Sequence, residues 1–290
     1  MTFRDQFYYR IQKLNSVDKL ILINIACFIL PLFLRTIFFL FNISSTDFFY
    51  WFELSESLID LAFKPWSILT YSFLHSGFFH LFWNMYLLFF SSRLFLNLFT
   101  TKTFFNVYFL GVLVGGVSFI LSYTFFPVFE NSSTAMIGAS AGVMAIFIFM
   151  STYSPNYEVR LILFNVELRY LGAIFVLIDV VQIPYGNAGG HLAHIGGAIL
   201  GFYYVKQLKN GKDIGKPFRI LIDLVIKIFK KKPKISTVYT KEKNKKKNHS
   251  TSVTITNQKR IDEILDKISL SGYESLTQNE KDFLYKSGKN

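Results

Sequence analysis

The sequence is poor in cysteine, and its first apolar run has few features of a cleavable leader. Only one of its 290 residues is a cysteine, so no internal disulfide can form. That residue, Cys27, lies inside a long apolar run near the N-terminus. The run is too long for the hydrophobic region of a signal peptide and has no convincing small-residue cleavage site. We therefore expect it to stay in the protein as a membrane helix.

Few charges interrupt the apolar parts of the chain. Hydrophobic residues make up 51 % of the sequence and aromatic residues 18 %, which is atypical of a soluble domain. The net charge is +12, but most of the basic excess follows residue 205. This distribution argues against a nucleic-acid-binding surface over the whole protein. It predicts instead a basic tail beside the anionic lipids of the cytoplasmic leaflet.

Six apolar blocks are candidates for membrane spans, since about twenty residues cross roughly 30 Å of hydrocarbon. Each should be helical, because the hydrocarbon offers no partner for free backbone groups. The shorter blocks are accommodated by tilt or by local thinning of the bilayer. The sequence thus predicts an all-α membrane protein with a six-helix bundle. The expected spans are 20–41, 79–96, 104–125, 137–152, 170–183 and 190–205.

The distribution of basic residues predicts the orientation. Lysine and arginine dominate before the first span and in the C-terminal tail, whereas the first loop is mainly acidic. The positive-inside rule then places both termini in the cytoplasm. Spans two, four and six consequently run from outside to inside, and their N-terminal ends meet near the outer face.

We divide the chain into four parts. They are a cytoplasmic segment 1–19, a six-helix domain 20–207, a basic cytoplasmic linker 208–250 and a small helical tail 251–290. No internal repeat is evident. The linker contains an amphipathic stretch, 219–230, which predicts a helix on the inner membrane surface, and then a lysine-rich run, 230–249, which we expect to be disordered.

The tail has the signals of a helical hairpin. Apolar residues at helical spacing precede Gly272, which is predicted to end the first helix. Thr277 and Glu280 are spaced as a capping box for the second.

Polar residues gather at the beginnings of spans two, four and six. Polar side chains within spans are costly and are usually functional or paired. Span two opens with His80 and carries Asn84 one turn later on the same face. Span four opens with Ser140, and span six with His194. A serine that reaches an imidazole nitrogen has the arrangement of an activated nucleophile.

Small residues accompany the serine and the histidine. Gly138 and Gly142 form one small-xxx-small pair, and Gly197 and Gly201 form another. Such pairs let helix backbones approach closely in lipid. We therefore assign these four glycines to helix packing beside Ser140 and the neighbouring histidine.

Three segments resemble the signatures of rhomboid intramembrane serine proteases, in the same order and on the same spans. They are His80-Leu-Phe-Trp-Asn84, Gly138-Ala139-Ser140 and Ala193-His194-Ile195-Gly196-Gly197. The approach to the second span, with Pro65-Trp66, Thr70-Tyr71 and His75, is also similar to that family. The final forty or so residues resemble a tail found on some bacterial members.

The resemblance implies a function and roles for particular residues. Ser140 would be the nucleophile and His194 the general base, while His80, Asn84 and the Ser140 N–H would form the oxyanion hole. The substrates would be transmembrane proteins, cut in or near their spans, with no metal or organic cofactor. The first loop, 43–77, would be embedded in the membrane beside the site. The resemblance further implies a multi-pass protein of a bacterial inner membrane.

Two departures from the family pattern leave an alternative open. Ala141 stands where glycine usually follows the nucleophile, and Met144 stands where an aromatic residue often stacks on the catalytic histidine. The alternative function is an inactive rhomboid-like protein that binds membrane clients. A small transporter is disfavoured, because the polar residues gather near one face rather than at mid-membrane depth.

Other polar residues near the serine and the histidine suggest alternative arrangements. His191, outside the signature, is expected to lie in a loop or behind the catalytic residues. A metal site formed by His80, His191 and His194 is disfavoured, because no carboxylate or cysteine completes a convincing ligand set. Asp179 suggests a Ser–His–Asp triad, but the resemblance implies a dyad, and we assign Asp179 a structural hydrogen bond.

Overall fold

The computed structural model describes residues 2–43, 48–160, 164–229 and 251–287. They fall into two compact units, Met1–Lys231 and Lys232–Asn290, which are described separately. The lysine-rich run 230–249, expected to be disordered, lies outside the described residues.

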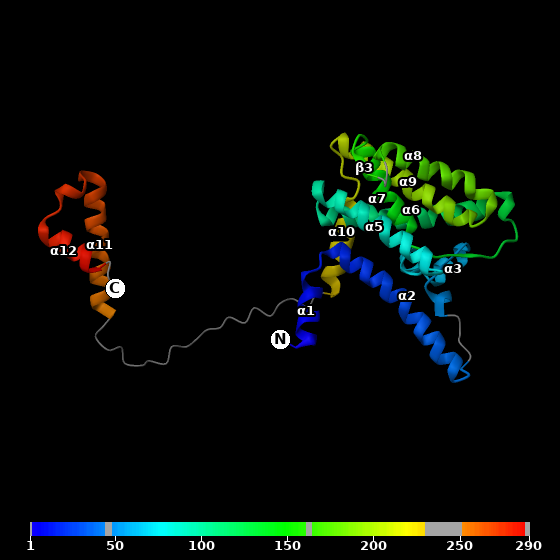
Figure 1. The fold of residues 1–290 in the computed structure, drawn as a ribbon, viewed down its shortest axis with the longest axis horizontal. Helices are drawn as coiled ribbons and strands as arrows, with labels where there is room; N and C mark the ends of the chain where they lie inside the picture. The colour runs from blue at the N-terminus through cyan, green and yellow to red at the C-terminus, as the bar shows by residue number, and fades with distance from the viewer. Residues whose placement is uncertain (1, 44–47, 161–163, 230–250, 288–290) are drawn as a thin grey trace. The chain divides into compact units, whose positions relative to one another are not determined.

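The first unit is built of helices, which confirms the predicted all-α membrane fold (Figure 1). A helix overlaps most of each of the six expected segments. By length and apolar composition, α2, α6 and the segment Leu168–Tyr185 that contains α8 are able to cross a membrane, and α7 is a shorter apolar helix. The number of spans therefore stays a prediction. The six helices are α2 (Ser16–Leu40), α5 (Phe78–Leu98), α6 (Thr101–Phe125), α7 (Ser140–Tyr153), α8 (Leu168–Gln182) and α9 (Ala188–Lys209).

Short elements fill the connections, and the sequence analysis did not predict the strands among them. The strands form two antiparallel pairs, β1 with β2 and β3 with β4. The helical turns are η1 (Phe48–Trp51), α3 (Leu58–Phe63), α4 (Ser67–Thr70), η2 (Tyr71–Phe73), η3 (Pro127–Phe129) and η4 (Ile183–Tyr185). The strands are β1 (Leu54–Ser55), β2 (Ala135–Met136), β3 (Glu158–Arg160) and β4 (Asn165–Glu167). Helix α1 (Phe3–Lys13) precedes α2, and α10 (Lys216–Phe229) follows α9.

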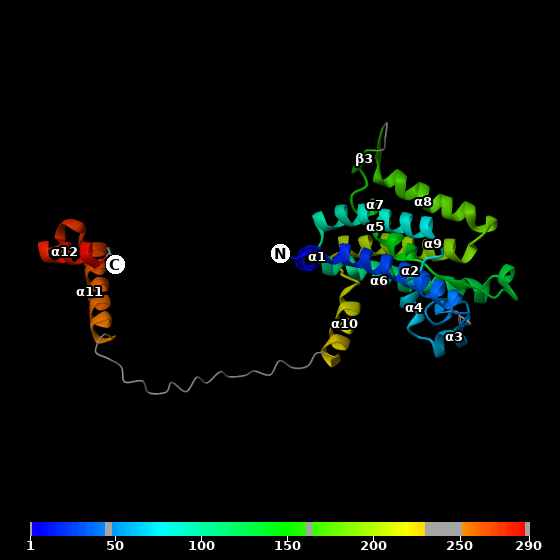
Figure 2. The same ribbon diagram turned by 60° about the horizontal axis from the view of Figure 1, so that its bottom comes forward.

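Helix α7 is the core of the bundle. Its residues from Ala141 to Ser151 are all buried, as expected for a helix that is apolar on every side. Helices α5, α6, α8 and α9 all contact it. In both views α8 lies along the edge of the bundle next to α9 (Figures 1 and 2). Many apolar side chains of α2 and α8 are exposed in the absence of lipid, as expected for helices that face hydrocarbon.

The loop before α5 is folded against itself by side-chain hydrogen bonds to its own backbone. Trp66 Nε1 donates to the carbonyl oxygen of Trp51 at 2.7 Å, and Thr70 Oγ1 donates to that of Phe52 at 2.8 Å. Strand β1 of this loop pairs with β2, which directly precedes α7. The loop therefore links the start of α5 to the start of α7.

The second unit is a helical hairpin. Helix α11 (Thr251–Ser271) ends at Gly272, whose φ of 75° suits glycine. After η5 (Tyr273–Ser275), α12 (Gln278–Ser287) begins beside Thr277, whose N–H donates to Glu280 Oε2 at 2.7 Å. Lys267 Nζ on α11 also donates to Glu280, at 3.0 Å, and so ties the two helices together.

Candidate active site

His80 has a defined tautomer because of the turn that precedes its helix. The backbone N–H of Ser76 donates to His80 Nδ1 at 3.4 Å, and Ser76 Oγ lies 3.1 Å from the same atom. A backbone amide can only donate, so Nδ1 accepts and a neutral ring carries its proton on Nε2. Nε2 is turned toward Gly138, where an added Cβ would lie 2.8 Å away. A hydrogen-bond donor thus faces the turn before α7.

Gly138 forms that turn and needs to be glycine for two reasons. Its φ is +129°, a conformation that side chains with a Cβ rarely adopt. His80 also leaves no room for a Cβ. The Gly138 N–H donates to the carbonyl oxygen of Tyr71 at 3.0 Å, which ties the turn to the loop before α5. Gly138 therefore precedes the helix and shapes a turn, rather than packing one helix on another as the sequence analysis expected.

Ser140 is the first residue of α7 and is half-buried. The first N–H groups of a helix have no partner within it, and the helix dipole favours negative charge at this end. Ser140 Oγ lies 3.5 Å from the position that a Cβ on Gly138 would occupy. The hydroxyl and the free backbone donors therefore lie beside the imidazole of His80.

Asn84 lies one turn after His80 on α5 and is buried. Its Nδ2 donates to the carbonyl oxygen of His80 at 2.9 Å. A carboxamide nitrogen carries two protons, so one N–H is used by this bond and the second is left as a donor.

Helices α7 and α9 are in close contact through glycines of α9. A Cβ on Gly197 would collide with the carbonyl oxygen of Ala141, and one on Gly201 would collide with that of Ala145. Gly142 faces α6 instead, with Tyr108 2.8 Å from its Cβ position. The small residues of α9 thus bring it against α7, while Gly142 serves the packing of α7 on α6.

Ala141, the residue after the serine, is accommodated by a glycine on α6. A Cβ on Gly115 would collide with the Ala141 methyl group. The missing side chain of Gly115 therefore makes room for alanine at the position where the family pattern has glycine.

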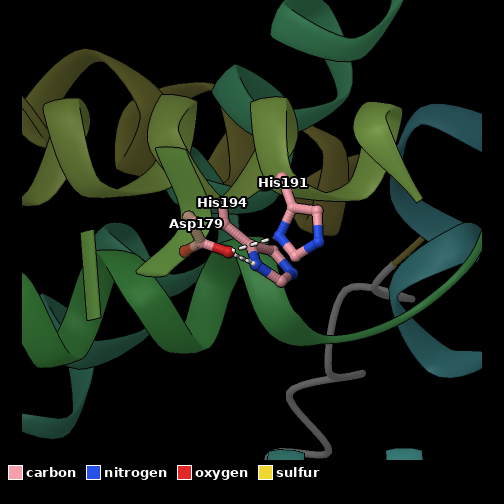
Figure 3. A group of neighbouring side chains, drawn as sticks. All are labelled: Asp179, His191 and His194. Carbon is pink, nitrogen blue, oxygen red and sulfur yellow. Dashed lines mark hydrogen bonds and ion pairs between the residues drawn. The ribbon is translucent and has the colours of Figure 1, made fainter. Parts of the chain in front are cut away.

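His194 and His191 share one carboxylate, which comes from α8 (Figure 3). Asp179 Oδ1 lies 2.8 Å from His194 Nδ1 and 2.7 Å from His191 Nδ1. Asp179 is buried, and its side chain is only 9 % exposed. The sequence analysis considered this aspartate and both histidines but did not predict that they form one cluster. The available signal was that Asp179 is the only acidic residue of an apolar helix that precedes two histidines.

Ser140 and His194 lie on helices that contact each other. Within the described part of the chain, no hydrogen bond joins Ser140 to His194. Both nevertheless belong to one region, since α7 and α9 are in contact and Gly197, one turn after His194, lies against the backbone of Ala141, the residue after Ser140. Catalytic hydrogen bonds are often long without substrate and tighten when it binds.

Asp179, His191 and His194 could also be considered as metal ligands, since their donor atoms lie within 4.8 Å of one another. A tetrahedral ion with bonds of about 2.0–2.1 Å separates its ligand atoms by roughly 3.3 Å. The two contacts to Asp179, at 2.7 and 2.8 Å, are shorter than that. The group is therefore arranged as a hydrogen-bonded cluster.

The family model described as the rhomboid domain matches residues 62–210, which is just over half of the chain. This chain is a rhomboid protein. The match begins in α3, ends directly after α9 and contains all the site residues described above. Together with the long apolar helices, it identifies a multi-pass membrane protein.

The C-terminal unit of the rhomboid protein matches a second family. Residues 253–289 match a family of unknown function, DUF6576. A search of curated proteins found no match.

Proposed function

We propose that this rhomboid protein is an intramembrane serine endopeptidase. The observation that carries the proposal is the position of Ser140 at the free end of α7, with His80 Nε2 facing the adjoining turn. A serine at a helix N-terminus beside an imidazole donor fits both parts of acyl transfer, namely the attack and the stabilisation of the resulting oxyanion.

The proposed reaction assigns one role to each residue. Ser140 Oγ attacks the carbonyl carbon of the scissile peptide bond and gives its proton to His194 Nε2. The negative oxygen accepts hydrogen bonds from His80 Nε2, Asn84 Nδ2 and the Ser140 N–H. His194 then protonates the leaving amine, and water hydrolyses the acyl enzyme with His194 again acting as base.

The proposed substrates are other membrane proteins, cut in or near their transmembrane segments. We propose that both termini lie in the cytoplasm of a bacterial cell, so that the site opens toward the outer face. Several apolar residues of α10, among them Leu221 and Leu224, are exposed, and the helix also carries Arg219 and Lys227. This combination supports a position near the anionic inner leaflet.

Purified full-length protein and a generic single-span substrate in detergent provide the test. Ser140→Ala and His194→Ala should each lower the cleavage rate by more than about 10³-fold. Ser122→Ala is a matched control, because the Ser122 hydroxyl also lies in a membrane helix and only donates to the carbonyl oxygen of Ser118. This control should cleave like wild type.

Two results would contradict the proposal. Wild-type rates in Ser140→Ala would exclude this serine as the nucleophile. Retention of the intact substrate by wild type without cleavage, across several substrates and lipids, would favour the inactive client-binding alternative.

A further inference from the structure

Burial of the Asp179 carboxylate at its position in the fold is unfavourable in free energy. It is buried on a helix whose neighbouring side chains, Ile178 and Val180, are about half exposed where lipid would lie. A charge at membrane depth is expensive unless hydrogen-bonded groups compensate it. Its hydrogen-bond donors are the imidazoles of His191 and His194, both from the first two turns of α9. The carboxylate is thus held by two imidazoles, one of which is the proposed base.

The contact with Asp179 determines which nitrogen of His194 is free. An ionised carboxylate only accepts hydrogen bonds, so His194 Nδ1 is the donor at 2.8 Å. A neutral imidazole carries a single ring proton. The lone pair is therefore on Nε2, the atom that has to accept the proton of Ser140.

His191 holds the same carboxylate oxygen from a second direction. It lies one turn before His194 on α9, and its Nδ1 is 2.7 Å from Asp179 Oδ1. With two donors on one oxygen, Asp179 has less freedom to rotate away from His194. His191 therefore supports the carboxylate, without a hydrogen bond to Ser140 among the residues that the structure describes.

We propose that Asp179 is a positioning residue for His194. Asp179 holds the imidazole of His194 in the orientation and the tautomer that a general base needs, and His191 supports Asp179. This inference rests on the proposed protease function. During attack, the O–H bond of Ser140 breaks, its proton binds to His194 Nε2, and the oxygen forms a bond to the substrate carbonyl carbon. The resulting imidazolium is stabilised by the ionised Asp179, which takes up no proton.

The test compares Asp179→Asn with Asp213→Asn in the full-length protein. Asp213 is a matched control, because its Oδ1 also accepts two hydrogen bonds, from Tyr204 Oη at 2.6 Å and from the Gly215 N–H at 3.0 Å. It lies beyond the end of α9, away from Ser140. Asp179→Asn should lower kcat by about 10²–10⁴-fold and leave KM within about threefold of wild type. Asp213→Asn should retain wild-type kcat, and thermal unfolding of both variants reports their stability.

A spectroscopic measurement tests the tautomer directly. The chain contains only five histidines, so ¹⁵N-histidine signals can be assigned with single His→Gln variants. In wild type, His194 should carry its proton on Nδ1; in Asp179→Asn the signal should move toward the Nε2-protonated form. A purely structural aspartate would not produce this shift in a variant that stays folded.

The outcomes separate this inference from the proposed function. If wild type and Asp179→Asn cleave equally while Ser140→Ala is inactive, the protease function stands and the positioning role is wrong. If Ser140→Ala cleaves like wild type, the function itself is wrong. A wild-type His194 protonated on Nε2, or a wild-type rate that collapses on metal chelation, would also overturn the hydrogen-bonded arrangement.

Discussion

Replacement of Gly138 by alanine should disable the site through His80. The added Cβ would lie 2.8 Å from His80 Nε2 and 2.9 Å from Cε1, whereas ordinary contact begins at 3.4 Å. The imidazole therefore has to move by roughly half an ångström or more, and misplacement of a catalytic group by about 1 Å can cost 10²-fold in rate. Loss of one oxyanion donor costs about 10²–10³-fold in kcat. We expect Gly138→Ala to lower kcat within that range.

The same substitution also strains the backbone, and Gly186 separates the two effects. Gly186 has a φ of +137°, close to the +129° of Gly138, but a Cβ there would meet nothing within 4 Å. An alanine in this region of backbone conformation costs about 1–3 kcal/mol. Both variants should therefore carry a similar backbone strain, and only Gly138→Ala should displace the proposed oxyanion donor.

The assay measures kcat and KM on the single-span substrate, together with the unfolding midpoint of each variant in the same detergent. A wild-type kcat in Gly138→Ala would refute the position of His80 as an oxyanion donor. An equal loss of kcat in Gly186→Ala would show that backbone strain, rather than His80, causes the effect.

Three other predictions concern packing, the tail and its pH dependence. Gly197→Ala should destabilise the protein by about 1–3 kcal/mol in denaturant unfolding, because its methyl group overpacks the α7 backbone. Hydrogen bonds from the Thr277 N–H and from Lys267 lower the pKa of Glu280 from 4.5 to about 2. These hydrogen bonds therefore stabilise the helical hairpin above pH 4.5, and this stabilisation is lost as the pH falls toward 2. Hydrogen exchange of the α12 amides should become faster over this pH range in wild type but not in Glu280→Gln. Deletion of 231–290 should leave most of the proteolysis intact, and complete loss in a folded, inserted truncation would contradict this.

The sequence was sufficient to predict the long helices but not the contacts between them. Long apolar blocks have few alternatives in hydrocarbon, so the positions of the six helices that they form could be predicted to within a few residues. The strand pairs β1–β2 and β3–β4 could not, since two or three residues carry no usable periodicity. The spacing of Gly138 to Gly142 suits a helix and so predicts helix packing, whereas the positive φ of Gly138 depends on the loop to which it is bonded.

The candidate site was predictable as a set of residues but not as a hydrogen-bond network. Ser140, His80 and His194 follow from motifs at the starts of their helices. The shared contact of Asp179 depends on how α8 rotates against α9, which places its one acidic side chain inward and its apolar neighbours outward. Such a rotation is determined by tertiary packing, and the periodicity of a nearly uniformly apolar helix contains little information about it.

The two departures from the rhomboid pattern are each matched by a feature elsewhere in the structure. Ala141 replaces glycine after the serine, and Gly115 on α6 leaves the space that its methyl group occupies. Met144 replaces the aromatic residue that would stack on the proposed base, and Asp179 contacts the Nδ1 edge of His194 instead. A hydrogen bond restrains both the orientation and the tautomer of a ring, whereas stacking restrains the orientation alone. If Asp179 takes over this task, Met144→Phe should not restore activity to Asp179→Asn, because an aromatic ring cannot return the proton of His194 to Nδ1.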